Sequence, residues 1–189
     1  MKRQNQIMQA IEYCLTNGKF ALLLFVCFLS SYSFGQDFDK KITDIATEIA
    51  DKVTATGKRN IAIIEFDNSG GSQTQLGVFL ADEISSSLAI LSSNQSKFTV
   101  LERANLDLIL EEKRILKSFD RSKLAKDLGK INAAEILISA TITEFNGYYR
   151  LNIKLLDTKT GNSLNSAKVS FVQEPSLKEL NKQTIEKSD

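Results

Sequence analysis

The stretch NIAIIEFDNSGGSQTQLG, residues 60–77, decides the fold class of this chain. It holds an apolar run, IAII, then a polar turn with two glycines, then the start of a long amphipathic segment. A nearly continuous apolar strand is typical of a sheet covered on both faces, and a strand that leads directly into a helix is the basic unit of α/β organisation. We therefore expect an α/β domain with a first strand at residues 59–66 and a turn at residues 67–71.

Apolar spacing predicts helices on both sides of this strand. Apolar residues recur at intervals of three and four in segments 39–56, 73–91 and 103–117. Gly57 fits the stop of the first helix, which either docks on the domain or is reserved for a partner. A short strand is expected at residues 97–101. Asp120 or Ser122 is expected to cap a further short helix that runs to Leu128 and stops at Gly129.

The apolar period changes to two from Ala134 onward, which predicts strands. Asn146-Gly147 is a strong hairpin signal because both positions tolerate positive φ. The sequence DTKTGN at 157–162 predicts a second turn, and Pro175 is expected to open a last helix to about Glu186. The sequence thus predicts a single α/β domain, in which helices pack on a mixed sheet that ends in an antiparallel meander.

The N-terminus has the pattern of an export signal. A positive region with Lys2, Arg3 and Lys19 precedes ten apolar residues, FALLLFVCFL at 20–29, which is about half the length needed to cross a bilayer. Small residues follow, so we expect cleavage between Gly35 and Gln36, with residues 1–35 removed and 36–189 forming the domain. Val26 before Cys27 does not fit a lipid-attachment motif, so no lipid anchor is expected.

The composition of residues 36–189 excludes several chemistries. This segment has no His and no Cys, so it can form neither a Ser-His triad nor a thiol nucleophile. Its formal net charge is −1, against +1 for the whole chain, which leaves no electrostatic footprint for nucleic acid. We expect no cofactor, no metal and no catalytic residue.

The turn at residues 67–71 lies where α/β proteins often bind phosphate, after a strand and before a helix. It nevertheless matches neither the P-loop nor the dinucleotide-binding pattern. We expect Gly70 and Gly71 to serve a tight turn. Glu102-Arg103 is expected to form local ion pairs near a helix start. Tyr148-Tyr149-Arg150 has two interpretations: aromatics exposed for a partner, or a cross-strand packing pair.

Five segments, in order, resemble the FlgO-domain proteins, which are relatives of the curli-secretion protein CsgG. The segments are IAIIEFDNSGG, LGVFLADEISSSL, FTVLERANLDLILEE, LAKDLGKINAAEILISATITEF and LLDTKTGNSL. The resemblance implies a non-enzymatic domain like that of CsgG and the N-terminal part of TolB. It also implies a place in a Gram-negative envelope, in the periplasm or at the periplasmic face of the outer membrane.

The resemblance further implies a protein that supports assembly or stability of a flagellar or secretion-type apparatus. Its partners would be other envelope proteins or itself, with peripheral membrane association allowed and no small-molecule substrate. The motif residues would be structural or partner-facing; they are Asp67, Asn68, Gly70, Gly71, Glu102, Arg103, Asp157, Thr160 and Gly161.

Other functions stay open at this point. Related α/β folds serve as activators of periplasmic cell-wall synthases, so a regulatory role is one alternative. A CsgG-like export pore subunit is another, although such pores need two additional amphipathic hairpins and the chain offers one meander. A secreted enzyme would have to rely on carboxylates alone.

Overall fold

The computed structural model describes residues 33–95, 97–101, 120–130 and 134–185. The chain separates into two compact units, Met1–Lys40 and Lys41–Asp189. In the first unit the described part, from Ser33, is helical backbone that belongs to helix α3, Ser33–Ala55. The expected helix at 103–117 and the pair Glu102-Arg103 lie outside the described residues. The remaining paragraphs of this section concern the second unit.

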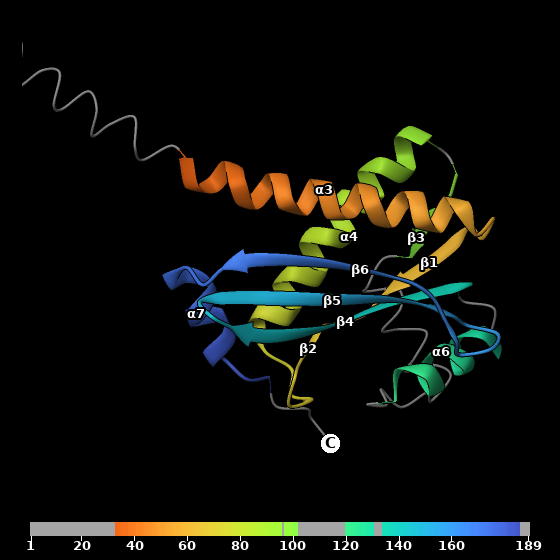
Figure 1. Ribbon diagram of the computed structural model, residues 1–189. Coiled ribbons are helices and arrows are strands. Elements are labelled where there is room, and N and C mark those ends of the chain that lie inside the picture. The colour runs from red at the N-terminus through yellow and green to blue at the C-terminus, as the bar shows by residue number, and fades with distance from the viewer. Residues whose placement is uncertain (1–32, 96, 102–119, 131–133, 186–189) are drawn as a thin grey trace, which may run out of the picture. The chain divides into compact units, whose positions relative to one another are not determined.

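The second unit is built on one mixed sheet. The strands are β1 (Asn60–Ile63), β2 (Asp67–Asn68), β3 (Thr99–Leu101), β4 (Ile136–Phe145), β5 (Tyr148–Asp157) and β6 (Ser163–Val172). Their order is β3-β1-β4-β5-β6, and β2 also pairs with β4. β1 is parallel to β3 and β4, whereas β4, β5 and β6 are antiparallel. The predicted single α/β domain with a mixed sheet and C-terminal meander is confirmed (Figure 1).

Two helices cover the apolar face of this sheet. Residues that pair across neighbouring strands point to the same face of a sheet, whether the strands are parallel or antiparallel. The register therefore places Ile61, Ile136, Ile138 and Leu155 on one side. These residues are buried, as is one stripe each of α3 and α4 (Gln75–Gln95). The two stripes are Ile42, Ile45, Ile49 and Val53, and Leu76, Leu80, Ile84 and Leu88. Figure 1 shows α4 passing behind the strands.

Among the described residues, helix α6, Arg121–Lys130, covers one end of the opposite face. It buries Leu124, Ala125 and Leu128 against a cluster of sheet residues. That cluster is Ala62, Ile64, Leu137 and Leu156, with Ala134 beside it. Farther along β4 and β5 the same face carries polar side chains. A short helix α7, Pro175–Lys182, follows the last strand, with Pro175 in its first turn as predicted.

Two sequence predictions, on the end of the first strand and on the role of Gly129, are wrong. β1 ends at Ile63, and Asp67-Asn68, expected in the turn, pairs with Thr141 and Ile142 as strand β2. Gly129, expected to end a helix, lies inside α6, which continues to Lys130. A Cβ at Gly129 would lie 2.2 Å from the Thr158 carbonyl oxygen, so this glycine permits close packing of helix on turn.

Several turn and boundary signals are confirmed. Asn146 and Gly147 have φ of 45° and 79° and connect β4 to β5. Gly57 follows the end of α3 with φ of 71°. Asp120 caps α6 by accepting hydrogen bonds from the backbone N–H groups of Ser122 (3.0 Å) and Lys123 (3.1 Å). These signals are local, which is why the sequence shows them.

The β6 end of the sheet order is tied to α3 by one hydrogen bond. Lys52 Nζ donates to the backbone carbonyl of Ser166 at 2.6 Å and also pairs with Glu48 on its own helix. This bond occupies a backbone acceptor of the last strand in the order.

Within the described residues, one helix, α4, is long and apolar enough by length and composition to cross a membrane. Its buried stripe packs within the domain, and the core helix of a globular protein passes the same test. We interpret α4 as a core helix.

Candidate functional site

The part of the sheet that α6 leaves uncovered is the main exposed feature of the domain. We call it the open face. It is formed by alternate residues of β4, β5 and β6, which the antiparallel register places on one side. They are Thr141, Thr143, Phe145, Tyr148, Arg150, Asn152, Lys154, Ser166, Lys168, Ser170 and Val172; Ser139 lies on the same side but is buried. Antiparallel sheets commonly pack one face on the core and solvate the other.

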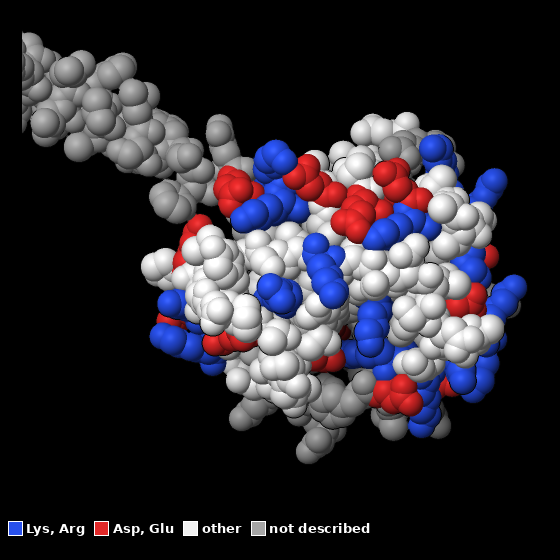
Figure 2. Space-filling view, viewed as in Figure 1, with Lys and Arg blue, Asp and Glu red and all other residues white. Residues whose placement is uncertain are grey.

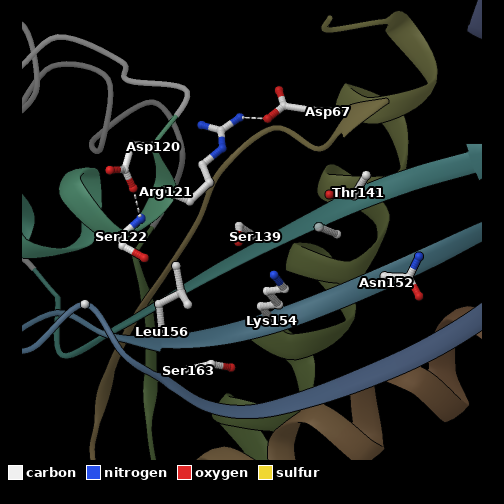
Figure 3. Close-up of a pocket in the computed structure, with 12 residues that line it drawn as sticks. Asp67, Asp120, Arg121, Ser122, Ser139, Thr141, Asn152, Lys154, Leu156 and Ser163 are labelled. Carbon is white, nitrogen blue, oxygen red and sulfur yellow. Dashed lines mark hydrogen bonds and ion pairs between the residues drawn. The ribbon is translucent and has the colours of Figure 1, made fainter. Parts of the chain in front are cut away.

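A polar pocket of about 350 Å³ lies between α6 and the open face. Ser139, Thr141, Asn152 and Lys154 line it from the sheet, and Asp120, Arg121 and Ser122 line it from the start of α6 (Figure 3). Its size is in the range of small-molecule sites, but such sites are mostly apolar and this lining is mostly polar.

Asp67 and Arg121 form an ion pair at the edge of the pocket (Figure 3). β2 places Asp67 beside Thr141 on the open-face side, and the first residue of α6 supplies the guanidinium. Both side chains are largely buried. Asp67 Oδ2 is held by Arg121, and Asp67 Oδ1 is buried without a hydrogen-bond partner. The pair joins β2 to α6, and each charge compensates the other in a largely buried position.

The backbone N–H groups of the turn after β2 are already hydrogen-bonded within the protein. Ser69 N–H donates to the Ile142 carbonyl, and Gly71 N–H donates to the Asn68 carbonyl. The Asn68 side-chain oxygen accepts hydrogen bonds from the N–H groups of Gly70 and Ser72, each at 3.0 Å. All four N–H groups that a phosphate would need are therefore satisfied within the protein. Gly71 has φ of 81°, so it serves the turn as expected, whereas Gly70 has no positive φ.

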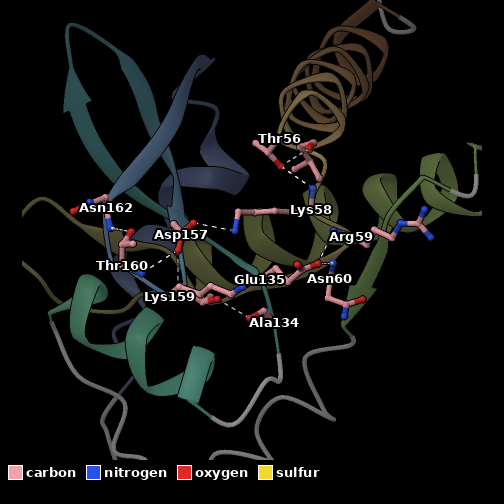
Figure 4. A network of polar contacts seen from close by, with 12 residues as sticks. Thr56, Lys58, Arg59, Asn60, Ala134, Glu135, Asp157, Lys159, Thr160 and Asn162 are labelled. Carbon is pink, nitrogen blue, oxygen red and sulfur yellow. Dashed lines mark hydrogen bonds and ion pairs between the residues drawn. The ribbon is translucent and has the colours of Figure 1, made fainter.

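Glu135 clamps the start of β1 to the start of β4 (Figure 4). Its Oε2 accepts hydrogen bonds from the backbone N–H groups of Arg59 (2.7 Å) and Asn60 (3.2 Å). These bonds, with the nearby Lys58 and Lys159 charges, hold the pKa of Glu135 below its ordinary value. Sequence reasoning missed this residue, because nothing local marks a carboxylate that bonds backbone some 75 residues away.

Asp157 organises the turn between β5 and β6 (Figure 4). Lys58 Nζ lies 2.9 Å from its Oδ2, while its Oδ1 accepts the N–H groups of Lys159 (2.7 Å) and Thr160 (2.9 Å). The Lys58 hydrogen bond is the main reason that the pKa of Asp157 lies below its ordinary value. Asp157 is therefore a turn-forming residue.

Thr160 and Gly161 complete the same turn. Thr160 Oγ1 accepts the Asn162 N–H at 3.2 Å, and Gly161 has φ of 73°. Gly161 also faces α6, since a Cβ there would lie 3.0 Å from the Ser122 carbonyl oxygen. The motif residues Asp157, Thr160 and Gly161 thus shape the turn that packs beside the pocket.

The two tyrosines after the hairpin turn have different surroundings. Tyr149 is buried and packs across the strands opposite Phe171, and burial raises the pKa of its hydroxyl. Tyr148 is 46% exposed on the open face. The packing interpretation therefore holds for Tyr149, whereas Tyr148 is exposed and its contact with a partner stays a prediction.

The motif residues do not form one site. Asp67 and Gly161 line the polar pocket, but Asn68, Gly70 and Asp157 belong to separate turns. Arg121, which holds Asp67 from 54 positions away in the sequence, was not foreseen. Gly35 and Gln36 lie in helical backbone near the start of α3, and cleavage between them remains a prediction.

The family of the chain follows from its sequence. A family model described as curli production assembly/transport component CsgG matches residues 43–150, more than half of the chain. The chain belongs to the CsgG family. The narrower FlgO-domain assignment remains a prediction. A search of curated proteins gave no significant match.

Solved structures with the same fold agree with this family assignment. The CsgG-family domain is similar to the LpoB C-terminal domain from Salmonella enterica, with 14% identity and a TM-score of 0.53. That match covers 70% of this chain and 96% of the other. The LpoB C-terminal domain from Escherichia coli gives 15% identity and a TM-score of 0.52, covering 70% and 98%. At these identities the likeness shows the fold alone.

Proposed function

We propose that this CsgG-family protein is an exported, non-catalytic component of the cell envelope that supports assembly or stability of an envelope apparatus through protein contacts. The observation that carries the proposal is the open face, a broad exposed sheet surface that neither α3, α4 nor α6 covers. The family description, which names an assembly and transport component, supports the same role.

The chemistry of the described residues fits binding better than catalysis. Asp67 is held by Arg121, and Asp120 caps α6. The pKa values of Glu135 and Asp157 both lie below their ordinary values, and these two carboxylates serve a structural clamp and a structural turn. A general acid would need a carboxyl whose pKa is raised toward neutrality.

A second candidate function is regulation of a periplasmic cell-wall synthase. The likeness to the LpoB domain, which covers nearly all of that domain, favours this alternative over a pore subunit. Among the described residues the only long hairpins are those of the β4–β6 meander, and these belong to the domain's own sheet.

Crosslinking in the native cell tests the proposed function. The full chain, tagged at its C-terminus, is crosslinked in intact cells, and captured proteins are identified by mass spectrometry after cell fractionation. We expect the protein in envelope fractions, together with components of one envelope apparatus. Recovery of a cell-wall synthase would select the regulatory alternative. A cytoplasmic location, or a hydrolytic activity lost on mutation of a pocket carboxylate, would refute the proposal.

A further inference from the structure

The hairpin end of the open face carries three exposed apolar side chains in one row. The register pairs Phe145 with Tyr148 and Tyr148 with Val172, so the three lie side by side across β4, β5 and β6. Their exposed fractions are 52%, 46% and 43%. Large apolar side chains that are exposed singly need no explanation, but three adjacent ones mark an interaction surface.

Basic side chains continue from this row along the same face. The Arg150 guanidinium lies 5.2 Å from the centre of the Phe145 ring. Beyond it, Lys168 stands opposite Asn152, and Lys154 stands opposite Ser166, so three successive rows each carry one cation. Rows two residues apart along a strand are separated by about 7 Å.

Strands β4, β5 and β6 carry no acidic side chain on this part of the face. No Asp or Glu of β4, β5 or β6 shares the face of Arg150; the two acids of these described strands, Glu144 and Asp157, are on the other side in register. Figure 2 shows separate blue side chains on a largely white surface over β5 and β6, whereas red and blue alternate along α3. Next to the apolar row, the charged side chains of β5 and β6 on this face are therefore all positive, and the acids Asp67 and Asp120 lie around the pocket that Lys154 also lines.

We infer that this surface, formed by Phe145, Tyr148, Arg150, Lys154, Lys168 and Val172, binds an extended acidic segment of a partner protein. The inference rests on the proposed function and adds the chemistry of the partner. An extended chain places alternate side chains on one side about 7 Å apart, which matches the spacing of the cations. Carboxylates at alternate positions would meet Arg150, Lys168 and Lys154 in turn.

The apolar row supplies the anchor of the same segment. Aromatic residues and Arg dominate the binding energy of protein interfaces, and charged rims mainly set the association rate and specificity. An apolar side chain of the partner packs on Tyr148, with Phe145 and Val172 beside it. The segment thus runs from the apolar row along β5 and β6 toward the polar pocket.

Two other occupants fit the surface less well. A second copy bound face to face would bring Arg150, Lys154 and Lys168 close to their own counterparts, because a two-fold interface uses the same patch twice. An anionic bilayer would meet Glu174, which follows Val172 by two residues at the hairpin end. A protein segment can place its charges to avoid this carboxylate.

Site-specific photocrosslinking tests the inference in cells that make the full chain. Benzoylphenylalanine replaces Tyr148 in one strain and Ile90 in a control strain, and crosslinked peptides are sequenced by mass spectrometry. Ile90 is 62% exposed on α4, which covers the other face of the sheet. We expect position 148 to capture one partner segment that carries an excess of Asp and Glu and an apolar residue at the crosslink.

Charge reversal gives the second readout. The double variant Lys154→Glu/Lys168→Glu should lower the yield of this crosslink about tenfold, as expected for reversing two exposed charge pairs. Lys130→Glu, at a highly exposed lysine on α6, is the matched control and should leave the yield unchanged. Circular dichroism melts of the purified variants show whether each one is folded.

The outcomes separate the inference from the proposed function. Capture at position 148 of a neutral or basic segment, a lipid or a second copy overturns the inference. Capture of a partner at position 90 but not at 148 also overturns it and leaves the proposed function standing. If neither position nor whole-protein crosslinking captures another envelope protein, the proposed function fails as well.

Discussion

Substitution of Gly77 by alanine tests the close approach of the start of α4 to the Phe66 backbone. Gly77 lies in the first turn of α4, next to the segment between β1 and β2. A Cβ built at this position would be 2.0 Å from the Phe66 carbonyl oxygen and 3.0 Å from its carbonyl carbon. The Phe66 side chain is fully buried, and its N–H donates to the Gly77 carbonyl at 3.5 Å. The added Cβ would therefore collide with the Phe66 backbone, which cannot rotate away as a side chain could.

The size of the effect follows from the distance that must open. Ordinary Cβ contacts lie at 3.4 Å or more, so the helix start and the Phe66 segment must separate by about 1.4 Å. Forcing atoms into a packed core costs about 1–3 kcal/mol, and the lost backbone hydrogen bond adds about 1 kcal/mol. Alanine regains about 1 kcal/mol as the better helix former. The cost of the clash exceeds this gain, so we expect the free energy of unfolding to fall by about 2 kcal/mol.

Urea unfolding of the purified domain, followed by circular dichroism, measures this loss. At this chain length about 2 kcal/mol corresponds to a fall in Tm of about 4–8 °C. Gly147→Ala is the control. A Cβ at Gly147 would have no atom within 4 Å, so this variant measures the cost of placing alanine at a positive φ of 79° without any clash. A Gly77→Ala domain as stable as the wild type would refute the packing of α4 against Phe66.

Three further predictions concern a turn, a helix cap and a charged side chain. Gly71→Ala, at φ of 81°, should cost about 1 kcal/mol in urea unfolding, and Gly70→Ala clearly less; equal losses would contradict the turn geometry. Asp120→Ala should cost about 1 kcal/mol by removing the cap of α6, while Asp120→Asn should retain most of it. Because the folded pKa of Glu135 is depressed, its stabilisation is complete above its ordinary value of 4.5 and is lost as the pH falls through the folded pKa. Glu135→Gln should therefore be less pH-dependent between neutral and acidic pH, and unchanged dependence would count against the clamp.

Sequence patterns predicted those features that depend on neighbouring residues. The Asn146-Gly147 hairpin, the Asp120 cap and the Gly57 stop each depend on side chains or φ values within one turn. The spacing of apolar residues likewise predicted the described helices α3 and α4 and the meander, with shifts of a few residues at their ends. Helix ends are set by packing and hydrogen bonds that the period alone does not contain.

Features that depend on distant segments were not predictable from one sequence. Gly129 looks like a helix stop, and only its contact with Thr158 reveals a packing role. The Asp67–Arg121 pair joins elements that the sequence separates widely. Tyr148 was recognised as a candidate contact residue, but its row with Phe145 and Val172 requires the strand register.

The bond from Lys52 to the Ser166 carbonyl has a consequence for how this protein behaves at high concentration. A ten-residue strand at the end of a sheet order is a template on which a neighbouring molecule can add its own strand, the first step toward fibres. Here an incoming strand would have to displace an ammonium group from its backbone acceptor and would meet a helix beside that position. The bond therefore opposes strand addition at Ser166 without occupying any side chain of the open face, so edge protection and the proposed recognition use different atoms of one sheet.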